Sequence, residues 1–257
     1  MRRLLPIFTL FALVAVGITT ASAQKLRVMS YNVKNGCGED GIKSIERCSD
    51  VILKAKPDVV AIQELDSCTR RNNFYVLGRM AEQTGYHAYF GPAINYQGGK
   101  YGIGILSKEK ALSVKYYPLP NHIEARCLLV VEFKKYYMLC THLSGVPQRL
   151  GRGIQVDIIR DVVAKLDKPA FIAGDTNARP TSAPMMAFKE FATVLSDENK
   201  KTAPSYDPRG CIDYVLGTNG TFKVLGEEVM YGCFASDHLP LYVDVKVGKA
   251  KKSKNKK

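Results

Sequence analysis

A set of acidic, amide and imidazole side chains interrupts otherwise apolar stretches of this sequence, at positions where short strands are expected to end. Asp, Glu and His are among the side chains that most often act as general acids, general bases or metal ligands. Any one of them alone is more often a turn residue, a helix cap or a hydrogen-bonded polar group. Together they indicate a polar cleft if the strand ends meet at one edge. The residues are Asn32, Glu64, His142, Asp175, Asn177, Asp213, Asp237 and His238.

Apolar and alternating patterns predict the elements that must position these residues. Strands are expected over 25–33, 58–65, 87–92, 101–108, 126–133, 136–143, 169–175, 211–218, 223–232 and 239–247. Helices are expected over 41–56, 74–86, 148–167 and 182–195. Strands outnumber helices, and antiparallel hairpins are mixed with helical crossovers. This combination predicts an α+β fold, a sandwich of mixed sheets with helices outside, built as one domain.

The N-terminal residues have the features of a cleavable export signal. Arg2 and Arg3 precede an apolar run over residues 4–18, and the small-residue site TTASAQK follows. The run is short for a membrane anchor, which needs about 20 apolar residues, so we expect cleavage after Ala23. No cysteine follows that site, so the sequence has no lipoprotein signature. These features predict a secreted or periplasmic protein, with residues 1–23 as a signal peptide and a domain over residues 24–247.

The formal net charge of +13 is concentrated at the two ends of the chain. Two arginines lie in the expected signal peptide, and seven lysines without any acidic residue lie in the final stretch KVGKAKKSKNKK. Without these charges the domain carries only about +4. Residues 248–257 are therefore expected to form a disordered lysine-rich tail. Such a tail could bind a polyanion, either nucleic acid or an anionic surface, or could serve only to keep the protein soluble.

Seven cysteines in an exported chain could form disulfide bonds, although the odd number leaves at least one thiol unpaired. Their spacing includes no C-x-x-C pair of the kind found in zinc sites. Two apolar runs joined near Lys134 and Lys135 are expected to form a hairpin, on which Cys127 and Cys140 point to the same face. A disulfide could form between these two cysteines, and the remaining connectivity cannot be derived from the sequence.

Seven short motifs together resemble a known family of phosphoesterases. SYNVKNG, QEL, ILSK, THLS, GDTNARP, IDYV and SDHLP occur in the order seen in the endonuclease/exonuclease/phosphatase superfamily. This superfamily includes deoxyribonuclease I, exonuclease III, inositol polyphosphate 5-phosphatases and bacterial sphingomyelinases. The resemblance extends over about residues 26–245, and it implies a four-layer α/β/β/α sandwich of two mixed sheets flanked by helices.

The resemblance also implies a divalent-metal site. Glu64 matches the family's metal-binding glutamate, and Asn32 and Asp237 match residues that complete or support that site. Hard oxygen ligands of this kind suit Mg²⁺, with Mn²⁺ as an alternative. A bound divalent cation would offset the negative charge that develops on the phosphoryl and leaving oxygens during ester cleavage.

Three further positions are expected to contact water or phosphate by the same resemblance. Asp175 and Asn177 match residues that orient and deprotonate the attacking water and contact the phosphate, or that ligate a second metal. Their spacing of two residues lets both side chains face one side of a strand end. Arg126 resembles a phosphate-contacting arginine, with a surface arginine as the alternative. Tyr101 is offset by one position from a tyrosine used in abasic-site enzymes, so that role does not transfer directly.

Two histidines complete the implied site. His142 and His238 match histidines that donate hydrogen bonds to phosphoryl oxygens, and Asp213 matches the carboxylate that pairs with the second of them. Such a carboxylate fixes the imidazole tautomer and raises its pKa. We therefore expect His238 to stabilise charge and Asp175 to act as the base.

The function that follows from this resemblance is a secreted, metal-dependent hydrolase of phosphomonoesters or phosphodiesters. The alternatives are a DNase-like nuclease and a non-catalytic polyanion-binding module on the same fold. A mature chain near the minimum size of the family, without tryptophan, fits a small phosphorylated substrate or loosely bound nucleic acid better than a bilayer. The protein is expected to act as a monomer.

Overall fold

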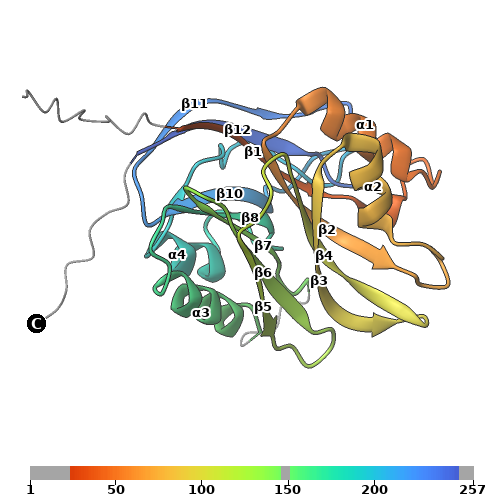
Figure 1. Cartoon of the computed structure of the whole chain (residues 1–257), viewed down its shortest axis with the longest axis horizontal. Coiled ribbons are helices and arrows are strands. Elements are labelled where there is room, and N and C mark those ends of the chain that lie inside the picture. The colour runs from red at the N-terminus through yellow and green to blue at the C-terminus, as the bar shows by residue number, and fades with distance from the viewer. Residues whose placement is uncertain (1–23, 146–150, 249–257) are drawn as a thin grey trace, which may run out of the picture.

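The computed structural model describes residues 24–145 and 151–248, and this part of the chain forms two six-stranded sheets packed face to face (Figure 1). The first sheet has the order β11 (Phe222–Val229), β12 (Leu241–Val247), β1 (Gln24–Asn32), β2 (Val59–Ser67), β4 (Gly99–Ser107), β3 (His87–Tyr96). The second has the order β5 (Ser113–Leu119), β6 (Arg126–Glu132), β7 (Tyr137–His142), β8 (Ala170–Asp175), β10 (Asp213–Thr218), β9 (Thr193–Val194). Each sheet is mixed, because β1 pairs with β2, and β7 with β8, in parallel, while their other pairings are antiparallel.

Helices cover the outer face of each sheet. α1 (Ile45–Ala55) and α2 (Val76–Thr84) pack together on the first sheet, and α3 (Gly151–Val163) and α4 (Ala183–Lys189) pack together on the second (Figure 1). A short 3₁₀ helix, η1 (Lys34–Gly36), follows β1. The predicted four-layer α/β/β/α sandwich is therefore confirmed.

The central core forms because the residues of both sheets that face inward are apolar. The outward-facing residues are apolar as well where helices cover them. In β12, Leu241, Val243 and Val245 are buried between the sheets, whereas Asp244 and Lys246 between them point outward. Burying each such side chain contributes about 1.5–3 kcal/mol. The same alternation determines which polar residues at the strand ends face the other sheet, and so which of them can meet.

Several element boundaries differ from those predicted from the sequence, and one strand was not predicted. The first helix begins at Ile45 rather than at residue 41, because Ser44 caps it by accepting a hydrogen bond from the backbone N–H of Arg47 at 3.3 Å. The helix expected over residues 182–195 ends at Lys189, and β9 follows as a partner of β10. Strand β5 was not predicted, because its largely exposed sequence SVKYYPL lacks a clear apolar alternation.

The predicted hairpin is confirmed, but a disulfide within it is not formed. Cys127 and Cys140 lie on the same inward face of β6 and β7, in the core between the sheets. Their sulfurs instead contact the backbone carbonyls of Gly91 and Ile62, at 3.3 and 3.5 Å. All seven cysteines are free thiols.

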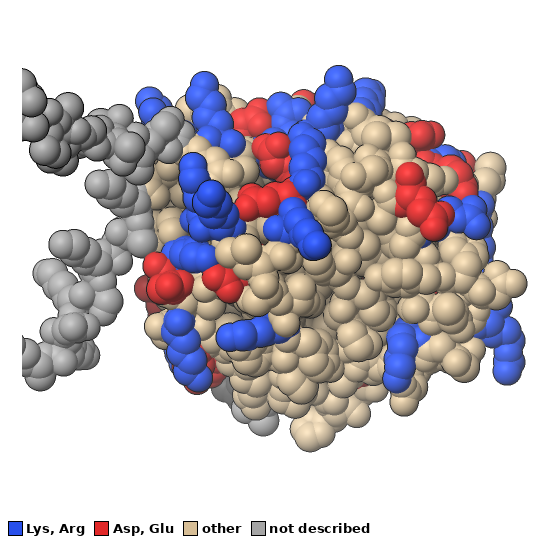
Figure 2. Space-filling view, viewed as in Figure 1, with Lys and Arg blue, Asp and Glu red and all other residues tan. Residues whose placement is uncertain are grey.

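The expected signal peptide and nearly all of the lysine-rich tail lie outside the described residues, and both stay predictions. Gly248, where the tail was expected to begin, still donates a backbone hydrogen bond to Thr221 at 2.8 Å. No helix within the described ranges is long and apolar enough to cross a bilayer. On the face shown in Figure 2, basic side chains are more numerous over the half that contains β11 and β12.

Candidate active site

Strand register places three of the predicted residues in one row. His142 at the end of β7 is the register partner of Asp175 at the end of β8, and Asp175 is the partner of Asp213 at the start of β10. Directly opposed residues point to the same face of a sheet. All three are almost completely buried, and they lie at one end of the second sheet.

Gly174 permits the close strand pairing on which this row depends. Its φ of 153° lies in a region that residues with side chains rarely adopt, and a Cβ there would lie 1.9 Å from the carbonyl oxygen of Thr141 on β7. Only glycine allows the two backbones to approach this closely. The glycine of the GDTNARP motif therefore has a structural role beside the acidic residue that it precedes.

Asp175 and Asn177 are linked through a turn of the backbone. The N–H of Asn177 donates to Oδ1 of Asp175 at 2.8 Å, and Asn177 has a φ of 49°, a left-handed conformation that asparagine tolerates well. The Nδ2 group of Asn177 then donates to the carbonyl oxygen of Leu143 and lies 3.1 Å from Nε2 of His142. Both side chains thus lie close to His142.

The second oxygen of Asp175 is the centre of the site. Oδ2 accepts a hydrogen bond from Nδ2 of Asn32 at 3.2 Å, and it lies 3.5 Å from Nε2 of His142 and 3.7 Å from Nε2 of His238. Burial, together with the negative charge of Asp213, raises the pKa of Asp175 to about 7, even though His238 opposes that shift. A carboxylate with a pKa near neutrality is well matched to accept a proton from water.

His238 is paired with Asp213 on the side away from Asp175. Nδ1 of His238 lies 2.9 Å from Oδ2 of Asp213, which also accepts a hydrogen bond from the hydroxyl of Thr202 at 2.6 Å. Burial alone would lower the pKa of His238, but the charge and hydrogen bond of Asp213, with the charge of Asp175, outweigh burial and raise it to about 10. His238 is therefore a cation at neutral pH.

His142 has the opposite surroundings. Nη1 of Arg126 lies 3.2 Å from Nδ1 of His142, and Nδ2 of Asn177 faces Nε2. Both partners are donors, and a protonated imidazole has no lone pair with which to accept from either. Burial lowers the pKa of His142 well below its ordinary value, and the charges of Arg126 and His238 lower it further. His142 is neutral.

Glu64 comes to this site from the first sheet. The pairing of β2 with β4 is interrupted between Ile62 and Leu65, and Glu64 has a left-handed φ of 62° at this irregularity. Such bulges redirect a side chain that regular pleating would place elsewhere. Oε1 of Glu64 accepts from Nδ2 of Asn32 at 3.0 Å, and the same amide group reaches Asp175 in the other sheet. Asn32 therefore links the two acids across the sandwich.

Asp237 and Arg126 lie at the edges of this cluster. Oδ2 of Asp237 forms an ion pair with Nζ of Lys34 at 2.9 Å, and no contact of Asp237 with Glu64 is found within the described ranges. Arg126 pairs with Glu124 at 2.7 Å, and its Nε is buried without a hydrogen-bond partner. Arg126 thus retains one buried donor that could point to a bound anion. The roles predicted for both residues stay predictions.

Three residues near the site were not among those predicted to act there. Thr202 holds Asp213, but it lies in a loop without a recognisable motif. Lys34 lies in SYNVKNG, and its ion pair with Asp237 and the hydrogen bond from its backbone N–H to Oδ1 of Asn32 place it at the edge of the site. Tyr101, noted in the sequence for its offset position, lies beside Glu64 and Arg126. Burial, followed by the charge of Glu64, raises its pKa.

A buried cluster of two carboxylates and one imidazole in this site could hold a metal ion. One ligand atom from each of Asp175, Asp213 and His238 lies within 4.8 Å of the others. Glu64 offers a second arrangement, because Oε1 is bound by Asn32 while Oε2 has no hydrogen-bond partner among the described residues. Both sets contain the hard oxygen donors that Mg²⁺ and Mn²⁺ prefer.

Comparisons with known proteins agree with this geometry. No curated protein sequence matches the chain. An endonuclease/exonuclease/phosphatase from Beutenbergia cavernae is 24% identical, with a TM-score of 0.71 over 87% of this chain and 72% of its own. The endonuclease/exonuclease/phosphatase from Bacteroides vulgatus is 17% identical, with a TM-score of 0.73 over 88% of this chain and 100% of its own. A mannosyl-6-phosphatase from Bacteroides thetaiotaomicron is 18% identical, with a TM-score of 0.67 over 86% of this chain and 99% of its own.

These structural likenesses show a common fold. The family model described as the Endonuclease/Exonuclease/phosphatase family matches residues 29–238, from the first strand through the histidine of SDHLP. That range includes every residue assigned here to the site. The chain therefore belongs to the endonuclease/exonuclease/phosphatase family.

Proposed function

We propose that this protein is a metal-dependent hydrolase that cleaves phosphate esters by attack of water. One observation carries the proposal. The carboxylate of Asp175, with a pKa raised to about 7, lies between a neutral imidazole at 3.5 Å and a cationic imidazole at 3.7 Å. This arrangement provides a base for water and a fixed positive charge on the same side of a bound phosphate.

Each residue of the cluster has a task that follows from its contacts. Asp175 accepts the proton of the attacking water, and Asn177 and the neutral His142 orient that water or a phosphoryl oxygen. His238, held as a cation by Asp213, stabilises the charge that develops on the phosphoryl oxygens. Arg126, with its unpartnered buried Nε, binds the phosphate from the opposite side.

We propose Glu64 as the principal metal ligand, with Asn32 orienting it. In the alternative group, His238 is protonated and cannot bind a cation through its ring nitrogens, and Oδ2 of Asp213 already accepts from Thr202 and pairs with His238, which leaves only Oδ1 of Asp213 without a partner. A bound Mg²⁺ or Mn²⁺ would supply positive charge to the phosphoryl and leaving oxygens. Asp237, paired with Lys34, would support this end of the site from further away.

The substrate class is proposed as a small phosphomonoester or diester, met outside the cytoplasm. The export signal predicted for residues 1–23 supports the location, and the small size of the domain supports a small substrate. The 18% identity to the mannosyl-6-phosphatase shows only the common fold, so a sugar phosphate is one member of the panel to be tested.

The decisive experiment is a substrate screen with purified protein and Mg²⁺. The panel contains hexose phosphates, nucleotides, an aryl diester, and single- and double-stranded DNA, each with and without EDTA. We expect Asp175→Asn to lower turnover of the accepted substrate by about 10²- to 10⁴-fold, whereas Asp161→Asn, at an exposed position on α3, leaves it unchanged. Equal turnover by Asp175→Asn and wild type would refute the assignment of the base.

Glu64→Gln tests the metal assignment separately. It should abolish activity at low Mg²⁺ and recover part of it at high Mg²⁺, because one charged ligand is lost while its neighbours remain. Calorimetric titration of Mg²⁺ into the protein without substrate provides a readout that does not depend on turnover. Unchanged Mg²⁺ affinity in this variant would place the metal elsewhere, on the group around Asp175.

A further inference from the structure

Two thiols from distant parts of the chain meet at one buried hydroxyl group. The hydroxyl of Tyr31 on β1 lies 3.9 Å from Sγ of Cys48 on α1 and 3.9 Å from Sγ of Cys233, in the loop between β11 and β12. The two sulfurs therefore cannot be farther apart than twice that distance. Neither cysteine takes part in the site described above.

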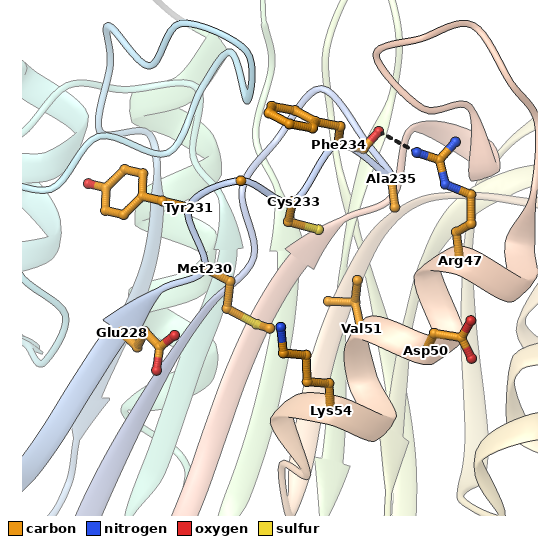
Figure 3. A pocket seen from close by; sticks show the side chains of 11 residues that line it. Arg47, Asp50, Val51, Lys54, Glu228, Met230, Tyr231, Cys233, Phe234 and Ala235 are labelled. Carbon is orange, nitrogen blue, oxygen red and sulfur yellow. Dashed lines mark hydrogen bonds between the residues drawn. The ribbon is translucent and has the colours of Figure 1, made fainter.

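Cys233 is partly exposed, whereas Cys48 is buried. A pocket of about 340 Å³ lies between α1 and residues 230–235, and Cys233 forms part of its wall. In Figure 3 its sulfur points from the loop toward α1, in the direction of Val51. Cys48, on α1, is completely buried and is not among the residues that line this pocket. A small reagent in the pocket can thus reach one thiol directly and the other only through the first.

The backbone around these thiols is already held in place. Sγ of Cys48 donates to the carbonyl oxygen of Ala235 at 3.5 Å, and Nη2 of Arg47 donates to that of Phe234 at 3.2 Å (Figure 3). The loop is therefore docked on α1 a few residues before His238. Bringing the sulfurs together requires side-chain rotation between staggered rotamers and displacement of the Tyr31 hydroxyl from between them.

We propose that Cys48 and Cys233 are a modification site at which a disulfide bond ties the loop carrying His238 to α1. A small-molecule disulfide is the oxidant. The thiolate of Cys233 attacks one of its sulfurs, which forms a mixed disulfide and releases one small thiolate. The sulfur of Cys48 then displaces the second small thiolate, which takes up the proton of Cys48. Two protein thiols are oxidised, and one small disulfide is reduced to two thiols.

The second step is the slow one. Burial raises the pKa of Cys48 to about 12, so little of its reactive thiolate is present at neutral pH. Closure should therefore accelerate as the pH rises from 7 to 9. Once formed, the bond closes a loop that spans most of the domain, and it restricts the unfolded chain strongly. We expect the midpoint of thermal unfolding to rise by roughly 5–10 °C.

The test compares the full-length purified protein after incubation with glutathione disulfide and with a reductant. Free thiols are alkylated, and peptides are mapped by mass spectrometry without reduction. We expect a Cys48–Cys233 peptide pair and a higher unfolding temperature only in the oxidised sample. Cys233→Ser should lack both, and Cys68→Ser, which removes an exposed thiol, should retain both.

The peptide map of the wild type decides the question even if a variant folds poorly. A fully oxidised sample in which Cys48 still carries the alkyl label would overturn the proposal. Linkage of Cys233 to a different cysteine, such as Cys37, would overturn it as well. None of these outcomes depends on the substrate, so the proposal stands or falls independently of the proposed hydrolase activity.

Discussion

His142 and His238 approach the same oxygen, Oδ2 of Asp175, from two parts of the molecule, and they carry different charges at neutral pH. His142 ends β7 in the second sheet, and His238 lies in the loop that leads to β12 in the first. Both imidazoles are largely buried, with side-chain exposures of 6% and 12%. Burial alone would make both neutral.

The difference comes from the partner on the far nitrogen of each ring. His238 faces the carboxylate of Asp213, which accepts a hydrogen bond and favours the cation. His142 faces the guanidinium of Arg126, which donates and favours the neutral ring. A single site can therefore hold one positive and one neutral imidazole a few ångströms from the same base. The following variants are designed to remove that difference.

The largest loss of turnover is expected when Asp213 or the cationic His238 is replaced. Asp213→Asn and His238→Gln should each lower turnover by about 10²- to 10⁴-fold, as expected for a lost charge-stabilising group. The double variant should lose far less than the product of the two losses, because the pair acts as a unit. Steady-state kinetics of the three variants with Mg²⁺ provides the measurement, and fully multiplicative losses would show that the residues act independently.

The same variants have a distinct pH signature. Wild-type activity should rise as Asp175 loses its proton near pH 7 and fall as His238 loses its proton near pH 10. In Asp213→Asn the charge that raises the pKa of His238 is absent, so the basic limb should move to lower pH. If activity fell at the same alkaline pH in Asp213→Asn as in wild type, that fall would not be due to loss of the proton from His238.

A smaller loss of activity is expected from a change beside the neutral His142. Arg126→Gln removes a positive charge and a donor from His142, so the pKa of His142 should rise toward its ordinary value while burial still holds it down. We expect kcat/KM to fall about 10- to 100-fold through the lost phosphate contact as well. NMR titration of the imidazole resonances measures the first effect. Arg160→Gln on α3 is the control, and a wild-type His142 that already titrates near its ordinary pKa would contradict the interpretation.

A variant that weakens the pair of Asp213 and His238 without replacing either residue should lower turnover less. Thr202→Val removes the hydroxyl that donates to Asp213 at 2.6 Å but leaves the contact with His238. We expect turnover to fall about tenfold, in line with one hydrogen bond to a charged group. Thr193→Val, at an exposed position on β9, is the matched control. A loss as large as that of Asp213→Asn would mean that Thr202 holds the carboxylate in place by itself.

The smallest effect on catalysis is expected at the far end of the domain. Lys25, Lys246 and Lys223 are register partners across β1, β12 and β11, and all three are exposed. These lysines lie at the end of the sheet where β12 ends, shortly before the lysine-rich stretch in the sequence. Asn32 lies at the other end of β1. We propose that this end binds polyanions. Deleting residues 249–257 should leave turnover of a small substrate unchanged and lower the salt concentration at which the protein elutes from immobilised heparin. Loss of small-substrate turnover would place the tail in the active site.

Much of the fold could be predicted from the sequence, because alternation of apolar residues reports which side of a strand is buried. Most strands and a sandwich of mixed sheets followed from that pattern, and the family resemblance implied the four-layer arrangement of two sheets. The motifs indicated which strand ends carry polar groups. Strand β5 could not be found this way, since its exposed outer surface carries no such pattern. The bulge at Glu64 was also invisible, because it depends on pairing with β4.

What the tertiary structure alone decided is how these groups act on one another. Asp213 and His238 are 25 residues apart, and Arg126 and His142 are 16 apart, yet each pair is in contact. A pKa depends on charges and hydrogen bonds within a few ångströms and on exclusion of water, and neither is a property of the residue itself. Through the family resemblance, the sequence indicated that Asp213 pairs with His238 and favours its cation. Only the fold made His142 neutral, because it placed the guanidinium of Arg126 beside that buried ring.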